Sequence, residues 1–168
     1  MTRSKIATFT LKRDALMYDI SNIAYVEGDI MPAESENAKH HTVDIAEDGN
    51  VDFVTRKMEL AYAECVEALY PYSKEEAKDY TTKDNDLEET EVYTINLKVD
   101  EDFSDTTINY ISKLAHEYIV NRVLSEWLQI TNPASADKYI LKCEDIKTQM
   151  RVRLNAYCGR VRRRQTPF

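Results

Sequence analysis

Glycine and proline are scarce in this chain of 168 residues, which contains only 3 Gly and 4 Pro. Folds made of many short strands use these residues at their tight turns, so the scarcity argues against an all-β sandwich or barrel. Long apolar runs are missing too: none approaches the roughly 18 residues of a membrane-spanning helix, and residues 1–11 lack the apolar core of a signal peptide. We therefore expect a mainly α-helical protein that is made and kept in a cytoplasm, away from membranes.

Cysteine is also infrequent. The three cysteines, Cys65, Cys143 and Cys158, are odd in number, widely spaced and placed within helical patterns. Disulfide frameworks use an even number of cysteines and zinc sites use closely spaced ones, so free thiols in a reducing compartment are the simplest interpretation.

The motifs of common enzyme families are absent. The sequence has no GxxxxGK[ST], GxGxxG, GxSxG or HExxH motif and no pair of CxxC motifs. His116–Glu117 stands on a predicted helix, but Val120 occupies the place of a second zinc histidine. His40–His41 and the acids that follow would bind a metal only from a bent loop, and a solvated loop is the simpler interpretation. We therefore predict no catalytic residue, no cofactor and no metal site, and hence a protein that is not an enzyme.

Charge is divided unevenly along the chain, whose net charge is −8. The first 150 residues carry 16 basic and 30 acidic side chains, a net charge of −14, whereas the last 18 carry six arginines and no acid. An acidic body repels nucleic acid over most of its surface. The basic segment instead favours a phosphate backbone or an acidic protein surface.

Two segments, near residues 5–12 and 91–100, alternate apolar and polar side chains, which is the pattern of half-buried strands. We expect them to pair as a small antiparallel ribbon. Two strands alone are only marginally stable in water, so the ribbon must pack on helices or borrow strands from a neighbouring subunit.

Apolar residues recur at helical spacing over most of the remaining chain. The predicted helices cover Arg13–Tyr25, the stretch from Asp52 to about Leu69, and the stretch from Ser104 or Asp105 to about Ile130. We expect Gly28 to close the first of them and Tyr70–Pro71–Tyr72 to stop the second.

A helical hairpin is predicted for the C-terminal part. Asn132–Pro133 combines a favourable N-cap residue with a proline at the first helical position, and the helical pattern then continues to Tyr157. Gly159 stands where a helix-ending glycine belongs. Two helices of about 25 residues joined by two or three residues form an αα-hairpin, with arms about 35–40 Å long.

The fold expected from these patterns is mainly α: a helical bundle built on the long C-terminal αα-hairpin, with a small antiparallel β ribbon. We expect one domain over residues 1–158, with long polar loops at residues 29–50 and 73–90. An extended basic arm, residues 159–168, follows it.

Tyrosine is unusually frequent, with 11 Tyr against 4 Phe and 1 Trp. Its apolar ring and polar hydroxyl suit either a protein–protein interface or the edge of a core. Four tyrosines near the end of the second predicted helix and the acidic loop after it make that region a candidate interface: Tyr62, Tyr70, Tyr72 and Tyr80.

The basic arm is the most distinctive local feature, with the sequence RVRRRQTPF. An arginine next to a helix C-terminus interacts favourably with the helix dipole, which accounts for the first arginine but hardly for the three consecutive ones. The residues expected to dock on a partner are Arg160, Arg162, Arg163, Arg164, Pro167 and Phe168. An acidic groove on another subunit is the favoured partner, and non-specific contact with the phosphates of DNA is the alternative.

The long αα-hairpin, the marginal ribbon, the acidic loops and the arginine-rich arm together resemble the head-to-tail connector (neck or adaptor) proteins of tailed bacteriophages. The segment from Tyr110–Ile111 to RRRQTPF at residues 162–168 is similar to small virion proteins from phages of gut Bacteroidetes. The resemblance implies a homo-oligomeric ring of twelve-fold symmetry whose arm docks on portal or tail proteins. It also implies a place in the neck of the virion, after assembly in the cytoplasm of the bacterial host.

Two other functions remain open from the sequence. The first is a different neck or tail component, such as a tail terminator, tail-completion or stopper protein. The second belongs to another class, a small regulatory protein that binds nucleic acid through its arginines.

Overall fold

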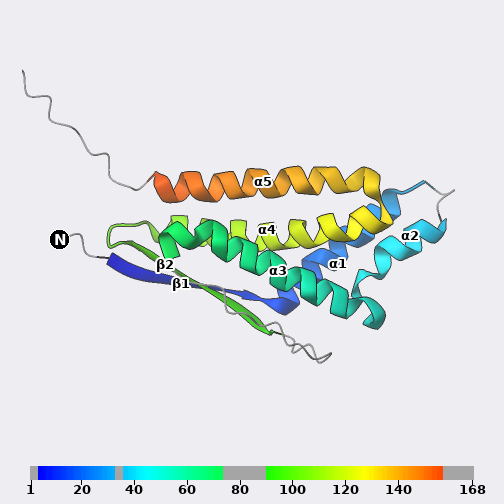
Figure 1. Cartoon of the computed structure of the whole chain (residues 1–168), viewed down its shortest axis with the longest axis horizontal. Helices are drawn as coiled ribbons and strands as arrows, with labels where there is room; N and C mark the ends of the chain where they lie inside the picture. The colour runs from blue at the N-terminus through cyan, green and yellow to red at the C-terminus, as the bar shows by residue number, and fades with distance from the viewer. Residues whose placement is uncertain (1–3, 33–35, 74–89, 157–168) are drawn as a thin grey trace, which may run out of the picture.

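The computed structural model describes residues 4–32, 36–73 and 90–156 (Figure 1). Within them the chain forms, in order, β1 (Ser4–Lys12), α1 (Arg13–Ile30), α2 (Glu36–Val43), the short 3-10 helix η2 (Asp44–Ala46), α3 (Asp48–Ser73), β2 (Val92–Asp100), α4 (Asp105–Thr131) and α5 (Pro133–Asn155). The prediction of a mainly helical fold with a small antiparallel sheet is confirmed.

The two strands pair antiparallel over their whole length, from Ser4 opposite Asp100 to Lys12 opposite Val92. β2 alternates strictly, burying Tyr93, Ile95, Leu97 and Val99, as its period-two pattern predicts. The ribbon packs on α3 through β2 and on α4 through β1. Helices of the same chain therefore give it the support that two strands require.

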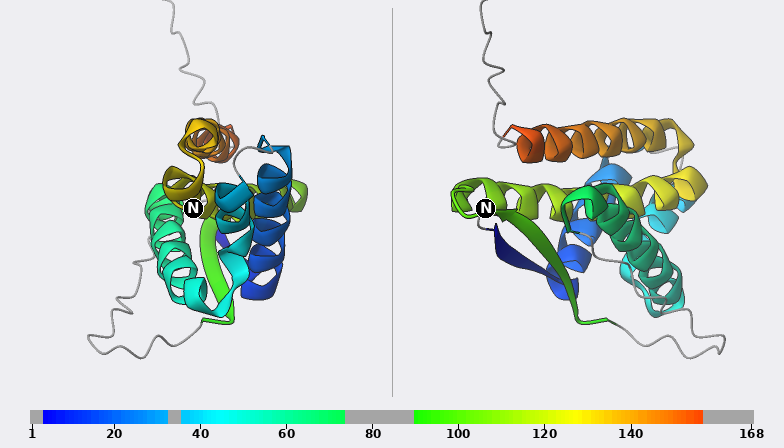
Figure 2. Two further views of the ribbon diagram at one scale, coloured as in Figure 1. Left: turned by 90° about the vertical axis from the view of Figure 1, so that its right-hand side faces the viewer. Right: turned by 60° about the vertical axis from the view of Figure 1, so that its left-hand side comes forward.

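The helix α4 is the centre of the bundle. It contacts α1, α2, α3, α5 and β1, and the four consecutive residues Tyr118–Asn121 are all buried. Consecutive residues point to every side of a helix, so α4 is covered on all sides. Figures 1 and 2 show α5 on one side of α4, with α1, α3 and the ribbon on the other.

The predicted αα-hairpin is confirmed: α4 and α5 are joined through Asn132 alone and pack against each other along their lengths. α5 buries one stripe of side chains, Ala136, Tyr139, Cys143, Ile146, Met150 and Leu154. Its predicted end at Gly159 lies outside the described residues. So do the arm at residues 159–168 and nearly all of the predicted loop at residues 73–90.

The predicted loop at residues 29–50 is wrong. This stretch contains the end of α1, all of α2 and η2, and the start of α3. Thr42 and Ile45 are completely buried, and Trp127 Nε1 donates a hydrogen bond to the Thr42 carbonyl oxygen at 3.0 Å. The short helix α2 thus depends on tertiary contacts, which its polar sequence does not reveal.

Two predicted helix ends are also wrong. α1 continues through Gly28 to Ile30, and the glycine lies where α2 crosses α1: a Cβ at this position would meet Val43 Cγ2 at 2.6 Å and the Lys39 carbonyl oxygen at 3.3 Å. α3 begins before Asp52 and runs past Leu69 to Ser73, with Pro71 in its last turn. Gly28 therefore serves close helix packing rather than helix termination.

Candidate functional site

A groove of about 560 Å³ opens between α3 and α5, above α4. α3 and α5 scarcely touch each other, so side chains rather than backbone fill the space between them. We call it the interhelical groove. It is lined by Glu64, Glu67 and Ala68 of α3, Tyr118, Arg122 and Ser125 of α4, and Ile140, Cys143, Glu144, Lys147 and Arg151 of α5.

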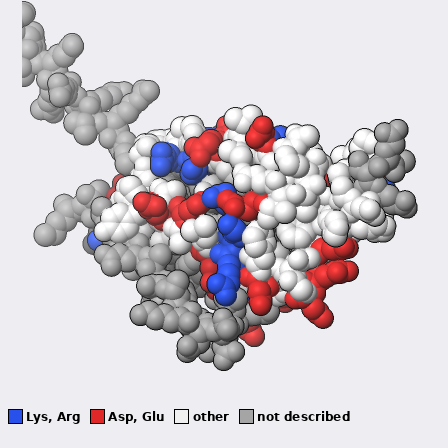
Figure 3. All heavy atoms as spheres, turned by 45° about the vertical axis from the view of Figure 1, so that its right-hand side comes forward, with Lys and Arg blue, Asp and Glu red and all other residues white. Residues whose placement is uncertain are grey.

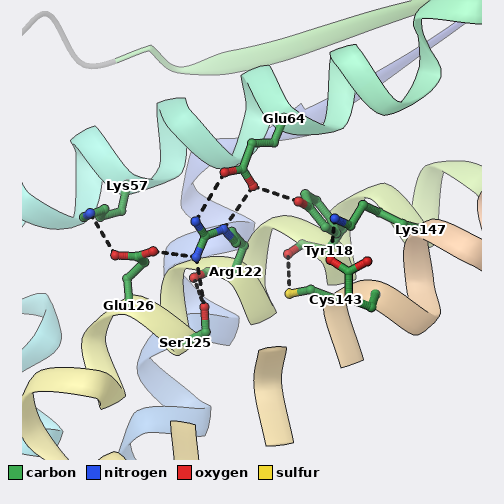
Figure 4. A network of polar contacts seen from close by, with 9 residues as sticks. Lys57, Glu64, Tyr118, Arg122, Ser125, Glu126, Cys143 and Lys147 are labelled. Carbon is green, nitrogen blue, oxygen red and sulfur yellow. Dashed lines mark hydrogen bonds and ion pairs between the residues drawn. The ribbon is translucent and has the colours of Figure 1, made fainter. Parts of the chain in front are cut away.

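Arg122 occupies the middle of a polar network in this groove (Figure 4). Its Nε and Nη2 atoms donate hydrogen bonds to the two carboxylate oxygens of Glu64 at 2.9 and 3.2 Å, while Nη1 donates to Glu126. Lys57 Nζ donates to the other Glu126 oxygen at 2.9 Å. Alternating charges from α3 and α4 thus join the two helices through a bidentate arginine–carboxylate pair.

The network keeps its acids ionised. Burial opposes the charge of Glu64, but hydrogen bonds from Arg122 and Tyr118 outweigh burial and lower its pKa. The hydrogen bond from Lys57, followed by that from Arg122, lowers the pKa of Glu126 despite burial. The hydrogen bond with Glu64 in turn raises the pKa of Arg122. Each charge is therefore stabilised by its partners.

The remaining reactive groups of the groove are held in their protonated forms. Tyr118 donates its hydroxyl hydrogen to Glu64 at 2.8 Å, and burial together with this bond raises the pKa of Tyr118. Burial raises the pKa of Cys143 to about 11 and that of Cys65, in α3, to about 12. A thiolate is the nucleophilic form of cysteine, so burial of these two thiols disfavours that form at neutral pH. The network therefore joins α3 to α4.

A second buried acid, Glu27 of α1, joins the N-terminal half of the chain to the hairpin. Glu27 is 5% exposed and accepts hydrogen bonds from Lys138 Nζ and from the Tyr139 hydroxyl, the latter at 2.7 Å. Burial opposes its charge, but the hydrogen bonds from Lys138, Tyr139 and Ser135 outweigh burial and lower the pKa of Glu27. Neither Glu27 nor Arg122 is recognisable from the sequence, because a lone charge within a helical pattern is typical of a surface residue.

The structure describes three of the four tyrosines of the predicted interface, Tyr62, Tyr70 and Tyr72. Tyr62 is half-buried, donates to the Thr94 carbonyl oxygen at 2.7 Å and packs on Tyr93 with ring centroids 4.9 Å apart. Tyr72 donates to Asn155 Oδ1 at 2.6 Å. Tyr70 is 40% exposed, and Tyr80 lies outside the described residues. Tyr62 and Tyr72 thus hold α3 to β2 and to the end of α5.

The docking residues of the basic arm, from Arg160 to Phe168, all lie outside the described residues as well.

The three histidines, His40, His41 and His116, lie within the described residues. His116 Nε2 is 2.7 Å from Asp19 Oδ2 and connects α4 to α1, while His40 and His41 stand on the helix α2 instead of in the predicted solvated loop. Among the described residues, no three His, Cys, Asp or Glu side chains are grouped so that they could hold a metal ion. In the same part of the chain, no helix has an apolar stretch of membrane-spanning length.

α1 carries several large apolar side chains that are exposed. We call the following residues the α1 face: Tyr18, Tyr25, Val26 and Ile30, which are 69%, 61%, 55% and 68% exposed. Tyr18 and Tyr25 lie on the side of α1 opposite the buried Leu16 and Ile20, while Val26 and Ile30 lie on the flank of the helix in its last two turns. Clustered exposed apolar side chains mark surfaces that are covered in an assembly.

Comparisons of this chain with models of protein families, with curated proteins and with solved structures found no match.

Proposed function

We propose that this chain is a structural subunit of a virion, forming a homo-oligomeric ring that joins the portal to the tail of a tailed bacteriophage. The α1 face is the observation that supports an assembly role most directly. Its four large apolar side chains are more than half exposed, and a neighbouring copy in a ring would remove them from water at roughly 25 cal/mol per Å² of apolar surface.

The rigidity of the bundle also suits a subunit of this kind. The Arg122 network joins α3 to α4, and Glu27 joins α1 to α5, so the hairpin and the N-terminal helices form one body. A ring that connects two larger assemblies must keep its angles fixed under load, and closely packed helices with satisfied buried charges resist deformation.

The ribbon offers a further surface for assembly. Within the described residues, β1 and β2 pair only with each other, so each strand has one edge without a strand beside it. Such an edge accepts a strand from another chain through backbone hydrogen bonds.

The roles of the arm and of the portal rest on the resemblance to phage connector proteins. In this proposal, residues 159–168 reach a neighbouring protein while the bundle forms the wall of the ring. A tail terminator, tail-completion or stopper protein would show comparable surfaces, and its place in the particle would differ.

Labelling of particles tests this proposal. A gold-conjugated antibody raised against the purified chain would be applied to intact particles of a phage that encodes it, and to heads and tails separated by dissociation. The account predicts label at the junction between head and tail. Label confined to the distal tail, or absence of the chain from purified particles, would contradict the connector role.

A further inference from the structure

A second pocket, of about 670 Å³, combines aromatic and acidic walls. We call it the Trp127 pocket. The rings of Phe53 and Trp127 lie in it with centroids 6.1 Å apart, and Ile130 stands beside them with 68% of its surface exposed. Trp127 is 7% exposed and its indole N–H donates to the Thr42 carbonyl oxygen, so the half-buried Phe53 and the exposed Ile130 supply most of the accessible apolar surface beside it.

Asp44 and Glu47 line the same pocket. Neither carboxylate forms an ion pair with any of the described residues. Lys57 is the cation that approaches the aromatic wall, with Nζ 5.5 Å from the Phe53 ring centroid, but it is committed to Glu126 at 2.9 Å. Figure 3 shows a group of Asp and Glu side chains at the lower right of this side of the molecule, without Lys or Arg next to it. A ligand with positive charges and one apolar side chain would complement these walls.

The interhelical groove is a poorer candidate for such a ligand. Glu64 and Glu144 of this groove form ion pairs with Arg122 and Lys147, and Arg151 lines the groove together with its third acid, Glu67. Figure 3 shows Lys and Arg side chains among Asp and Glu side chains in the middle of this face. A positively charged segment would have to displace ion pairs there, whereas at Asp44 and Glu47 it would form new ones.

We propose that the Trp127 pocket binds the segment Arg160–Phe168 of a second copy of this chain. The consecutive arginines Arg162–Arg164 pair with Asp44 and Glu47, and Phe168 packs on the wall formed by Trp127 and Phe53. Arginine pairs well with carboxylates because its planar guanidinium donates two parallel hydrogen bonds. The inference rests on the assembly role proposed above and identifies the partner of the arm.

Geometry favours a second copy over the chain's own arm. Trp127 and Ile130 lie at the end of α4 from which α5 departs, and α5 then runs to the opposite end of the bundle (Figure 1). The 23 residues of α5 cover about 35 Å at ~1.5 Å per residue. From Ala156 to Arg164, a fully extended backbone spans at most about 29 Å. The arm would therefore have to run back along the whole of α5 in a nearly fully extended form to reach its own pocket, whereas the pocket of a second copy imposes no such requirement.

A contact of this kind joins two different surfaces, the arm of one copy and the pocket of the next. Repeating it produces a closed ring when the rotation between copies closes, and an open filament when it does not. The same chain thus supplies both halves of a head-to-tail interface.

The single tryptophan of the chain provides a direct test, because Trp127 is in the pocket. A synthetic peptide with the sequence RVRRRQTPF, which lacks tryptophan, would be titrated into the full chain while indole fluorescence is recorded. We expect a saturable change in emission. A peptide in which the three consecutive arginines are glutamines should bind at least tenfold more weakly, and a peptide with Phe168→Ala should also lose affinity.

Variants of the chain locate the binding site. Asp44→Lys with Glu47→Lys should weaken binding of the peptide at least tenfold, whereas Asp137→Lys with Glu101→Lys, an equal change of charge at exposed positions away from the pocket, should not. Circular dichroism verifies that both variants are folded. If Asp44 and Glu47 serve only the start of α3, the first variant melts earlier and binds the peptide normally, which would overturn the proposal.

Three further outcomes distinguish a failure of the pocket from a failure of the connector role. Unchanged Trp127 emission at saturating peptide refutes the pocket even if the chain forms rings, and arginine-dependent binding of a labelled DNA duplex without binding of the peptide assigns the arm to nucleic acid instead. Conversely, peptide binding by a chain that is absent from the head–tail junction leaves the pocket standing and refutes the connector role.

Discussion

Arg122 shows how this fold accommodates charge near its core. A partly buried guanidinium loses hydration, and that loss is offset only when its donors meet acceptors in good geometry. Here Glu64 receives two of its hydrogen bonds and Glu126 a third, and Lys57 balances the second acid. Removing the central cation would leave two carboxylates facing each other across α3 and α4.

Replacement of Arg122 by methionine should therefore destabilise the protein. We expect the free energy of unfolding to fall by about 1–3 kcal/mol, because two part-buried acids lose their partner, a value reduced by their partial exposure to water. Chemical denaturation would measure it. Arg151→Met, at an exposed position in the same groove, is the matched control and should change stability by less than about 0.5 kcal/mol. Equal effects of the two substitutions would mean that the network contributes nothing.

Acid should destabilise the fold through Glu27. Its pKa is lower in the folded chain than the ordinary value of 4.5, so its contribution is fully present above that value and is lost as the pH falls through the folded pKa. Melting temperatures of the chain and of Glu27→Gln, recorded by circular dichroism between neutral pH and about pH 3, would test this. The variant should be less stable at neutral pH and should lose less stability on acidification. Parallel curves would contradict the assignment.

Substitution by alanine should have opposite effects on stability at Gly28 and at Gly49. Gly28→Ala places a methyl group against Val43 and the Lys39 carbonyl, so α1 and α2 must separate, at a cost of about 1–3 kcal/mol. Gly49→Ala, in the first turn of α3 with nothing within 4 Å of the new atom, should be neutral or stabilise by up to about 1 kcal/mol because alanine favours helix. Thermal unfolding of both variants measures the difference. Gly28→Ala as stable as Gly49→Ala would show that the crossing is looser than described.

At the scale of the elements, the sequence was most informative where local signals agree with tertiary structure. Asn132–Pro133 marks the hairpin turn within a residue, and the alternation of β2 predicts each of its buried side chains. The register of the ribbon is harder to obtain, but alternation in both segments sufficed to predict their antiparallel pairing.

Prediction from the sequence failed where the local signals for an element or a contact are weak. Residues 29–50 are polar because α2 rests on the bundle through few side chains, so no apolar stripe announces it. The polar network was missed for a related reason. Arg122 and Glu64 are 58 residues apart, and Lys138 and Glu27 are 111 apart, so nothing local connects the partners.

Substitution of a buried residue tests whether residues 29–50 pack on the bundle. If the segment were a solvated loop, Ile45→Ala would change little. Because Ile45 is completely buried, we expect a loss of about 2–4 kcal/mol in the free energy of unfolding. Ile30→Ala, at a position 68% exposed, is the control and should have a small effect. Urea denaturation of the two variants distinguishes the alternatives.

At the scale of the whole molecule, the surfaces suited to assembly lie on different sides of one rigid body. The α1 face is exposed on α1, and the Trp127 pocket is lined by α2, α3 and the end of α4 that precedes α5. Figure 1 shows that this end of α4 lies opposite the C-terminal end of α5. Surfaces arranged in this way join copies head to tail and do not require two-fold pairing.

The α1 face should matter for assembly and not for folding. Tyr25→Ser with Val26→Ser removes two exposed apolar side chains, so the melting temperature of the monomer should stay within a few degrees while the dissociation constant of the assembly rises about tenfold or more. Leu60→Ser, on an exposed position of α3, is the matched control. Sedimentation velocity at several concentrations measures both. Unchanged association of the double variant would exclude the α1 face as an interface.

We infer that several copies of this chain act together. The mass of the protein in solution shows how many copies associate. Native mass spectrometry of the full chain, alone over a range of concentrations and mixed with portal particles, would count the copies. The account predicts one defined multiple of the 19.5 kDa subunit, either by itself or on the portal. A monomer under every one of these conditions would contradict it.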